Sequence, residues 1–276
     1  MTQRSLLITG CSSGIGLDAA RTMTQRGWRV FATCRQEQDC ERLRAEGLES
    51  FTLDYASSES VMAGAEKVRE LTDGKLDALF NNGAFAIPGL VEDLSRDALR
   101  HLFETNFFGQ FELINALLPA MCQCGTGRIV NCSSVLGFAA MPFRGAYNAS
   151  KFAMEGLTDT LRRELDDSPV HIILIEPGPI HTRIRENSIT QFERWIDWEN
   201  SNQRSRYENE LRPRLYKPDA KKDRFELPAS AVTEKLIHAL EHPRPRPRYY
   251  VTTPTHIAGI LNRILSTRML DKVLLR

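Results

Sequence analysis

Tyr147 and Lys151 stand four residues apart in the stretch GAYNASKFAMEG, which is predicted to begin a helix. Residues four apart are neighbours on a helix, so the lysine ammonium can approach the tyrosine hydroxyl. A free tyrosine has a pKa of about 10, and a nearby cation favours its phenolate; lowering that pKa by about three units takes roughly 4 kcal/mol. The pair is therefore predicted to act as a general acid and base, against the simpler alternative of a chance pairing.

A pair of serines weakens the chance alternative. Ser133 and Ser134 lie at the end of an apolar run, in VNCSSVLG, and Ser134 precedes Tyr147 by thirteen residues. Ligands of open α/β sheets bind at the carboxyl ends of the strands. A serine hydroxyl at this edge can donate to a substrate carbonyl beside the tyrosine and stabilise the charge that grows during hydride transfer.

A glycine-rich loop follows the first apolar run. The segment TGCSSGIG carries Gly10, Gly14 and Gly16 and leads into a predicted helix that ends at Gly27. Glycines permit a tight turn and a close approach of the backbone to a pyrophosphate at the helix N-terminus. The first gap is one residue longer than in the dinucleotide fingerprint, and an ordinary strand-helix turn competes. The preceding strand and following helix favour a nucleotide site.

The end of the second strand indicates which nucleotide binds. A site for NAD places an acidic residue there, on the ribose 2'-hydroxyl, whereas this chain has Cys34 and Arg35 and no carboxylate before Glu37. Arg35 can pair with a 2'-phosphate, with the hydroxyls of Ser12 and Ser13 nearby in the sequence. The prediction is NADP(H); a plain surface arginine is the alternative.

Apolar runs of strand length alternate with helical patterns along the chain. The runs are uniformly apolar, as in strands covered on both faces, and the alternation predicts an α/β fold with a doubly wound parallel (Rossmann) sheet in a single domain. A helix is predicted over 101–121. The predicted strands span residues 5–9, 28–33, 50–53, 76–80, 128–133, 170–176 and 248–253.

Two parts of this domain are expected to differ in role. Residues 1–184 form the dinucleotide-binding and catalytic core, and residues 185–276 form a substrate lid, a final helix and strand, and an amphipathic tail. The segment 187–226 is rich in charge, and its Phe192, Trp195 and Ile196 share one helical face. Such a face usually packs in a core; it is interpreted here as an apolar roof over the site.

Composition excludes several classes of protein. Thirty-six basic and thirty-five acidic residues give a net charge of +1, so no nucleic acid partner is expected. The six cysteines and six histidines show no metal-ligand spacing, so no metal is predicted and the thiols are expected to be reduced. No signal-like leader and no apolar stretch of about 20 residues is present, which favours a cytoplasmic protein.

Taken together, these motifs resemble the short-chain dehydrogenase/reductase family. The chain has TGCSSGIG, TNFFG, YNASK and PGPIHT in that family's order over residues 5 to about 184. It is most similar to the hydroxysteroid and retinol dehydrogenases and related NADP-dependent aldehyde reductases, also in the ending PRYYVTTP. One departure is Asn-Asn-Gly-Ala at 81–84, where the family has Asn-Asn-Ala-Gly; Ala84 then carries a Cβ where none is usual.

The resemblance implies a role for each matching residue. Tyr147 would exchange the proton, Lys151 would hold the nicotinamide ribose, Ser134 would orient the carbonyl and Asn106 would hold a relay water. The implied cofactor contacts are Gly10, Ser12, Ser13, Gly14, Ile15, Gly16, Arg35, Asp54, Asn82, Gly83, Tyr147, Lys151, Pro177, Gly178 and Thr182. The residues expected at the substrate are Val135, Met141, Phe192 and Trp195.

The predicted function is an NADP(H)-dependent oxidoreductase that interconverts an apolar alcohol and its aldehyde or ketone, in a homo-oligomer. A non-catalytic NADP(H)-sensing protein is the rival; retention of all four catalytic groups argues against it. A third interpretation concerns the tail, where Ile257, Ile260, Leu261, Ile264 and Leu265 form an apolar stripe. Docking on the same chain or on a second subunit is its commoner use, and contact with a membrane surface is the alternative.

Overall fold

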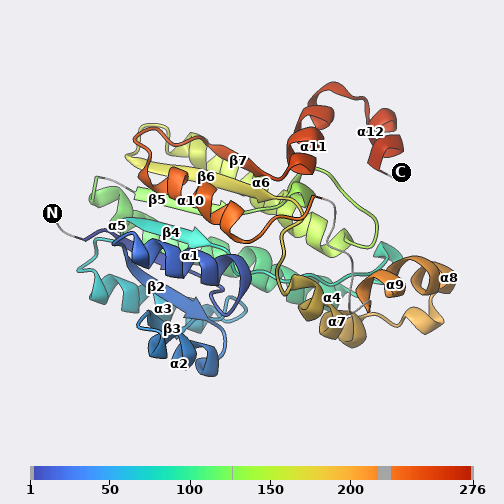
Figure 1. The fold of residues 1–276 in the computed structure, drawn as a ribbon, viewed down its shortest axis with the longest axis horizontal. Coiled ribbons are helices and arrows are strands. Elements are labelled where there is room, and N and C mark those ends of the chain that lie inside the picture. Colours follow the sequence, from blue (N-terminus) through green and yellow to red (C-terminus); the bar gives the residue numbers. More distant parts are fainter. Residues whose placement is uncertain (1–2, 126, 217–224, 275–276) are drawn as a thin grey trace.

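The computed structural model describes residues 3–125, 127–216 and 225–274. Seven parallel strands form one sheet in the order β3-β2-β1-β4-β5-β6-β7 (Figure 1). The chain builds outward from β1 to β3 and then returns to β4 beside β1, so the strand order reverses between β1 and β4. The strands are β1 (Ser5–Ile8), β2 (Arg29–Cys34), β3 (Glu49–Thr52), β4 (Ala78–Asn81), β5 (Gly127–Cys132), β6 (Val170–Pro177) and β7 (Arg248–Val251).

Helices connect the strands and extend beyond them. The helices are α1 (Gly14–Gln25), α2 (Glu37–Ala45), α3 (Ser58–Leu71), α4 (Arg96–Phe103), α5 (Gly109–Gln123), α6 (Gly145–Glu164), α7 (Ile184–Trp195), α8 (Arg204–Arg206), α9 (Arg212–Leu215), α10 (Ser230–Glu241), α11 (Thr253–Ile264) and α12 (Thr267–Leu274).

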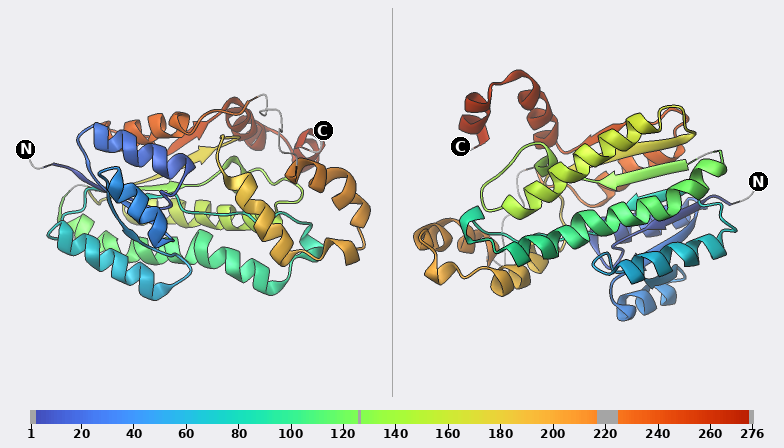
Figure 2. Two further views of the ribbon diagram at one scale, coloured as in Figure 1. Left: turned by 60° about the horizontal axis from the view of Figure 1, so that its bottom comes forward. Right: turned by 180° about the vertical axis from the view of Figure 1, so that it is seen from behind.

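Apolar side chains project from both faces of the sheet and pack against helices. Leu6 and Ile8 pack on one face with residues of α1, α2 and α10, whereas Leu7 packs on the other with residues of α3 and α5. Figure 2 shows these two helical layers from further directions. All seven predicted strands and the doubly wound single-domain fold are confirmed. The pattern was informative because strands covered by helices on both faces carry uniformly apolar side chains.

The helix predicted over 101–121 is not one regular helix. A π-helical turn, Glu104–Phe108, joins α4 to α5 and contains the fully buried Asn106. A π turn accommodates an extra residue within a helix and occurs often at functional sites. The turn therefore sets where the Asn106 amide points.

The lid segment has its own core. Residues of α7, of the π-helical turn Tyr207–Leu211 and of α9 pack against α4 and the start of α6 in a third apolar cluster. Figure 1 shows α7, α8 and α9 beside α4. Residues 217–224 of the predicted lid lie outside the described residues.

The tail projects from the body as two helices, α11 and α12 (Figure 1). Thr255, Ala258 and Gly259 of α11 are buried, but no residue of α12 is. The exposed apolar side chains of the two helices are Ile257, Ile260, Ile264, Met269 and Val273. Within the described ranges, no helix has the length and hydropathy needed to span a bilayer.

Candidate active site

The predicted site residues meet at one edge of the sheet. Gly10, Arg35, Asp54, Asn82, Ser134 and Gly178 follow, or nearly follow, the last residues of β1, β2, β3, β4, β5 and β6. All these strands are parallel, so their carboxyl ends lie together beside the point where the strand order reverses.

The three glycines of the loop after β1 have little room for side chains. Gly10 and Gly14 have φ of +68° and +59°, in the left-handed region that favours glycine. A Cβ on Gly16 would lie 2.3 Å from the Gly10 carbonyl oxygen. The Ser13 side chain does not cap α1, so the first N–H groups of this helix are left for another acceptor. Such a bare cradle fits a pyrophosphate.

Thr9 and Tyr55, two residues that the sequence did not single out, hold the next loop in place. Thr9 Oγ1 accepts hydrogen bonds from the backbone N–H groups of Asn82, at 3.0 Å, and Gly83, at 3.2 Å. The Tyr55 hydroxyl lies 2.9 Å from Thr9 Oγ1. Ala84 is not among the described non-glycine residues with positive φ, so its Cβ needs no unusual backbone there.

Arg35 is exposed, and no described carboxylate forms an ion pair with it. Arg42 of α2, which the sequence did not point to, donates to the Ser12 carbonyl at 2.6 Å. Arg42 also contacts Asp39 at 3.0 Å. Arg35 thus follows β2 directly, and the Arg42 guanidinium is bonded to the glycine loop.

Tyr147 and Lys151 occupy the first turns of α6 and are 9% and 1% exposed. The Lys151 ammonium donates to the Cys132 carbonyl at 2.7 Å and lies 5.6 Å from the centre of the Tyr147 ring. Ser134, at the end of β5, donates to the Pro177 carbonyl at 3.5 Å. Tyr147 and Lys151 come from α6 and Ser134 follows β5, and the sheet edge brings the three side chains together.

The predicted lowering of the Tyr147 pKa by Lys151 is not seen. Burial raises the pKa of Tyr147, and the Ser134 hydroxyl and the Arg144 guanidinium oppose this rise. Burial also lowers the pKa of Lys151, against the effects of Cys132 and Glu155. The prediction relied on Lys151 together with a positively charged nicotinamide; among the protein's own groups, the cost of removing each charged form from water dominates.

Asn106 is linked to both the loop after β4 and α6. Its Oδ1 accepts from the Phe85 N–H at 3.1 Å, and its Nδ2 donates to the Phe85 carbonyl at 2.9 Å. Nδ2 also lies 3.3 Å from Ser150 Oγ, which in turn donates to the Tyr147 carbonyl at 2.9 Å. The amide is therefore fixed beside the helix that carries the tyrosine and lysine.

The predicted substrate residues fall in different surroundings. Phe192 is 1% exposed and packs in the lid core against Tyr207, so its ring is enclosed by protein. The Trp195 ring lies 5.4 Å from the ring of His101 on α4. Val135 is half-buried directly after Ser134, and Met141 is exposed. Contact of any of these four with a substrate remains a prediction.

Thr182 lies against the glycine loop: a Cβ on Gly14 would be 3.1 Å from Thr182 Cγ2. Gly178 has closer neighbours still, because a Cβ there would be 2.2 Å from Thr252 Oγ1. The β-branched Thr252 has a φ of +80°, a conformation rare for such a residue. The turn after β6 therefore needs glycine, and the start of α11 closes it.

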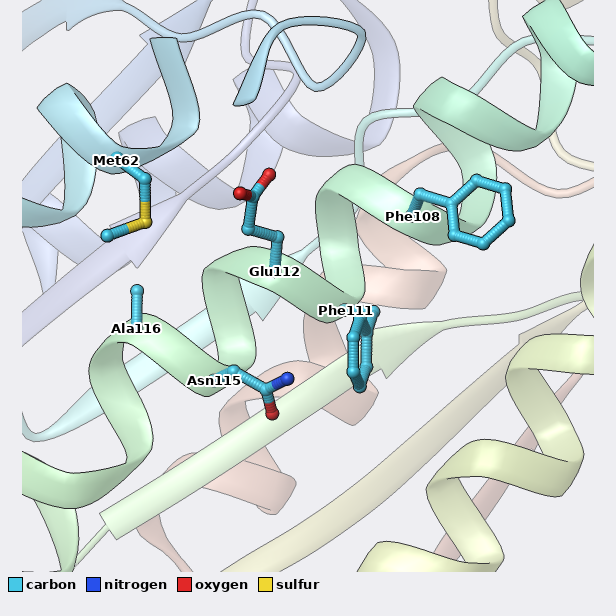
Figure 3. Close-up of a pocket in the computed structure, with 6 residues that line it drawn as sticks. All are labelled: Met62, Phe108, Phe111, Glu112, Asn115 and Ala116. Carbon is cyan, nitrogen blue, oxygen red and sulfur yellow. The ribbon is translucent and has the colours of Figure 1, made fainter. Parts of the chain in front are cut away.

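A surface pocket of about 450 Å³ lies elsewhere, between α3 and α5 (Figure 3). It contains none of the predicted catalytic or cofactor residues. Its lining residues are Met62, Phe108, Phe111, Glu112, Asn115 and Ala116.

Comparison with known proteins identifies the family. The family model described as short chain dehydrogenase matches residues 4–192. The chain belongs to the short-chain dehydrogenases. Among curated members, it is 41% identical over 273 residues to the uncharacterized oxidoreductase YbbO of Escherichia coli strain K12, covering 99% of this chain and 94% of that protein. It is 34% identical over 264 residues to human 17-beta-hydroxysteroid dehydrogenase type 1, covering 91% and 78%.

A solved short-chain dehydrogenase/reductase from Burkholderia phymatum, in complex with NAD, has a TM-score of 0.78 and 27% identity. The match covers 99% of this chain and 95% of that one. The family resemblance inferred from the motifs, near the hydroxysteroid dehydrogenases, is thereby confirmed, and an oxidoreductase of this family uses a nicotinamide cofactor.

Proposed function

We propose that this short-chain dehydrogenase is an NADP(H)-dependent enzyme that interconverts an apolar alcohol and its aldehyde or ketone. One arrangement carries the proposal: Tyr147 and Lys151 on α6 face the end of β5 at Ser134, beside the bare glycine cradle. When bound, the nicotinamide cofactor supplies or accepts the hydride.

The protein's groups then have separate tasks. The Tyr147 hydroxyl gives its proton to the carbonyl oxygen in reduction and takes it back in oxidation. Ser134 donates to the same oxygen and stabilises its developing charge. Lys151 would hold the nicotinamide ribose, and Asn106 would position the water that returns the proton to the lysine. Pro177, Gly178 and Thr182 would hold the nicotinamide end.

The preference for NADP(H) rests on charge at the end of β2. Arg35 has no partner among the described carboxylates, and Arg42 stands beside the same loop. Guanidinium groups suit a 2'-phosphate, whereas no carboxylate stands between the end of β2 and Glu37 to hold a 2'-hydroxyl. Asp54 and Asn82 would contact the adenosine from the neighbouring strands.

The substrate class rests on the lid, whose core is apolar, and on the similarity to human 17-beta-hydroxysteroid dehydrogenase type 1. We also propose that the protein is a homo-oligomer and that, in keeping with its six free thiols, it is cytoplasmic. The test is oxidation of NADPH, followed by absorbance, with steroids, retinoids, long-chain aldehydes and sugars. Turnover of apolar carbonyl compounds supports the proposal; binding of NADPH without any turnover supports the rival sensor.

A further inference from the structure

The ammonium of Lys151 is buried without a directly bonded carboxylate. Its one hydrogen bond within the described residues is to the uncharged Cys132 carbonyl, at 2.7 Å. A buried charge without a counter-charge is costly, and a lysine in that position readily loses its proton. A lysine that must remain charged in this place needs an anion close by.

Glu155 is the carboxylate that fits this need. It lies four residues after Lys151, one turn further along α6, and is 7% exposed. Residues at this spacing are neighbours on a helix. The Glu155 carboxylate raises the pKa of Lys151, against the effect of burial.

Arg248, at the start of β7, fixes Glu155 from the opposite side. Its guanidinium forms ion pairs with Glu155 and with Glu176 at the end of β6, and contacts Asp159 at 2.7 Å. Glu176 is fully buried directly before Pro177. The cluster joins α6, β6 and β7 immediately behind the catalytic edge.

The members of this cluster are not equivalent. Asp159 is shared with Arg162, at 2.6 Å. Burial, and then Glu155, raises the pKa of Glu176 to about 8, against Arg248, so Glu176 is largely protonated at neutral pH. Burial also raises the pKa of Glu155, but the Ser133 hydroxyl and the Arg248 guanidinium oppose that rise. Glu155 is also the glutamate of the cluster that acts on the pKa of Lys151. The charged and titratable groups around the pair are Cys132 on β5, Glu176 on β6, Arg248 and Tyr250 on β7, Arg263 on α11, and Tyr147, Asp159 and Arg162 on α6.

We propose that Glu155 is a positioning residue that supplies the counter-charge for the buried ammonium of Lys151, and that Arg248 holds Glu155 for this task. The inference deepens the proposed function and rests on it, because Lys151 serves Tyr147 and the cofactor there.

The direct test is Glu155→Gln, which keeps the shape and removes the charge. Without the anion, Lys151 loses its proton at lower pH, so the alkaline limb of the kcat/KM profile for carbonyl reduction should move down by about one pH unit. Glu176→Gln is the matched control: it changes a carboxylate on the same guanidinium that does not border Lys151, so the limb should stay in place. Glu164→Gln, exposed at the end of the same helix, should match the wild type.

Arg248→Met supplies a second arm. Loss of the guanidinium favours protonation of Glu155, so the alkaline limb of the kcat/KM profile should again move to lower pH. The double variant, with both Glu155→Gln and Arg248→Met, should show no larger shift than Glu155→Gln alone. If Arg248→Met fails to fold, the two glutamine variants decide the matter. A Glu155→Gln profile that superimposes on the wild type, with a uniform fall in kcat or a lower Tm, overturns the proposal, because that result marks a purely structural role.

Calorimetric titration with NADPH across pH gives a readout that needs no turnover. In Glu155→Gln, affinity should begin to fall at a lower pH than in the wild type, since the lysine is proposed to hold the ribose. The same pH dependence in both proteins overturns the inference. Absence of turnover by the wild-type protein with every carbonyl compound instead rejects the proposed function and leaves this binding comparison valid.

Discussion

Lys151 and Tyr147 are one helical turn apart on α6, with the ammonium 5.6 Å from the centre of the phenol ring. The lysine thus lies beneath the ring and is bonded to the Cys132 carbonyl, at 2.7 Å. The Lys151 ammonium is thus held by the end of β5, which leaves the Tyr147 hydroxyl as the group that exchanges the proton.

Replacement of Tyr147 by phenylalanine should therefore reduce kcat by at least about 100-fold, the usual scale for loss of a general acid. The ring remains to pack, so NADPH should bind with nearly unchanged affinity. Steady-state kinetics and calorimetry measure the two effects. Tyr249→Phe, which removes a hydroxyl from β7 away from the site, serves as the control. Substantial turnover by Tyr147→Phe would refute the assigned proton chemistry.

The two reaction directions should respond differently to pH. Burial raises the pKa of Tyr147, so its hydroxyl stays protonated at and above neutral pH. Reduction uses the protonated form, whereas oxidation needs the phenolate. We expect kcat/KM for alcohol oxidation to rise between about pH 7 and 10 while reduction stays flat near neutrality. A pH-independent oxidation rate over this range would contradict the assignment.

Cofactor preference should depend on Arg35 more than on Arg42. Arg35→Ala should weaken NADPH binding by about 1.5 to 3 kcal/mol, as for a lost charge-assisted contact, and leave NADH binding nearly unchanged. Arg42→Ala should have a smaller effect, because Asp39 already shares its charge, at 3.0 Å. Arg163→Ala, exposed on α6, is the control. Equal affinity of the wild-type protein for NADPH and NADH would contradict this prediction.

The two lid aromatics should behave differently. Phe192 is buried in the lid core, so Phe192→Ala should lower stability by about 3 to 5 kcal/mol. Trp195 is half-buried against His101, so Trp195→Ala should mainly change selectivity between long and short aldehydes. The measurements are denaturant unfolding and the ratio of kcat/KM values. An unchanged ratio in Trp195→Ala would remove this residue from the substrate site.

Stability should fall as pH rises through neutrality. The pKa of Glu176 is raised to about 8 by burial, above the ordinary value near 4.5 that it regains on unfolding. The native state therefore binds more protons between these values, and the contribution is lost as pH rises through the folded-state pKa. Glu176→Gln should flatten the decline in Tm from about pH 5 to 8. An identical decline in the variant would assign the effect to other groups.

Local patterns predicted the parts of the site that have local causes. The strands are continuous apolar runs, the glycine loop lies between a strand and a helix, and the Tyr147–Lys151 spacing falls within one helix. Parallel pairing alone then placed the strand ends together. The order of the strands was not predicted, because the alternation of strands and helices fits more than one doubly wound order.

Hydrogen bonds and ion pairs between residues far apart in the sequence could not be predicted from local patterns. Arg248 meets Glu155 and Glu176 across 93 and 72 residues, and each looks like an ordinary charged residue in its own segment. Tyr55 and Thr9 are separated by 46 residues. The pKa of Tyr147 could not be deduced either, because it depends on how much water the surrounding elements exclude. Burial is a property of the whole fold.

The π-helical turn Glu104–Phe108 has a consequence for insertions and deletions. A π turn is one residue longer than the α-helical path that it replaces. Deletion of Phe107 would let α4 and α5 join as one regular helix, but successive helical residues differ by about 100° around the axis. The segment before the deletion would then rotate by about that angle relative to α5. The Asn106 amide would then lose its hydrogen bonds to Phe85 and Ser150. We therefore expect an insertion or deletion in this segment to be more damaging than a substitution.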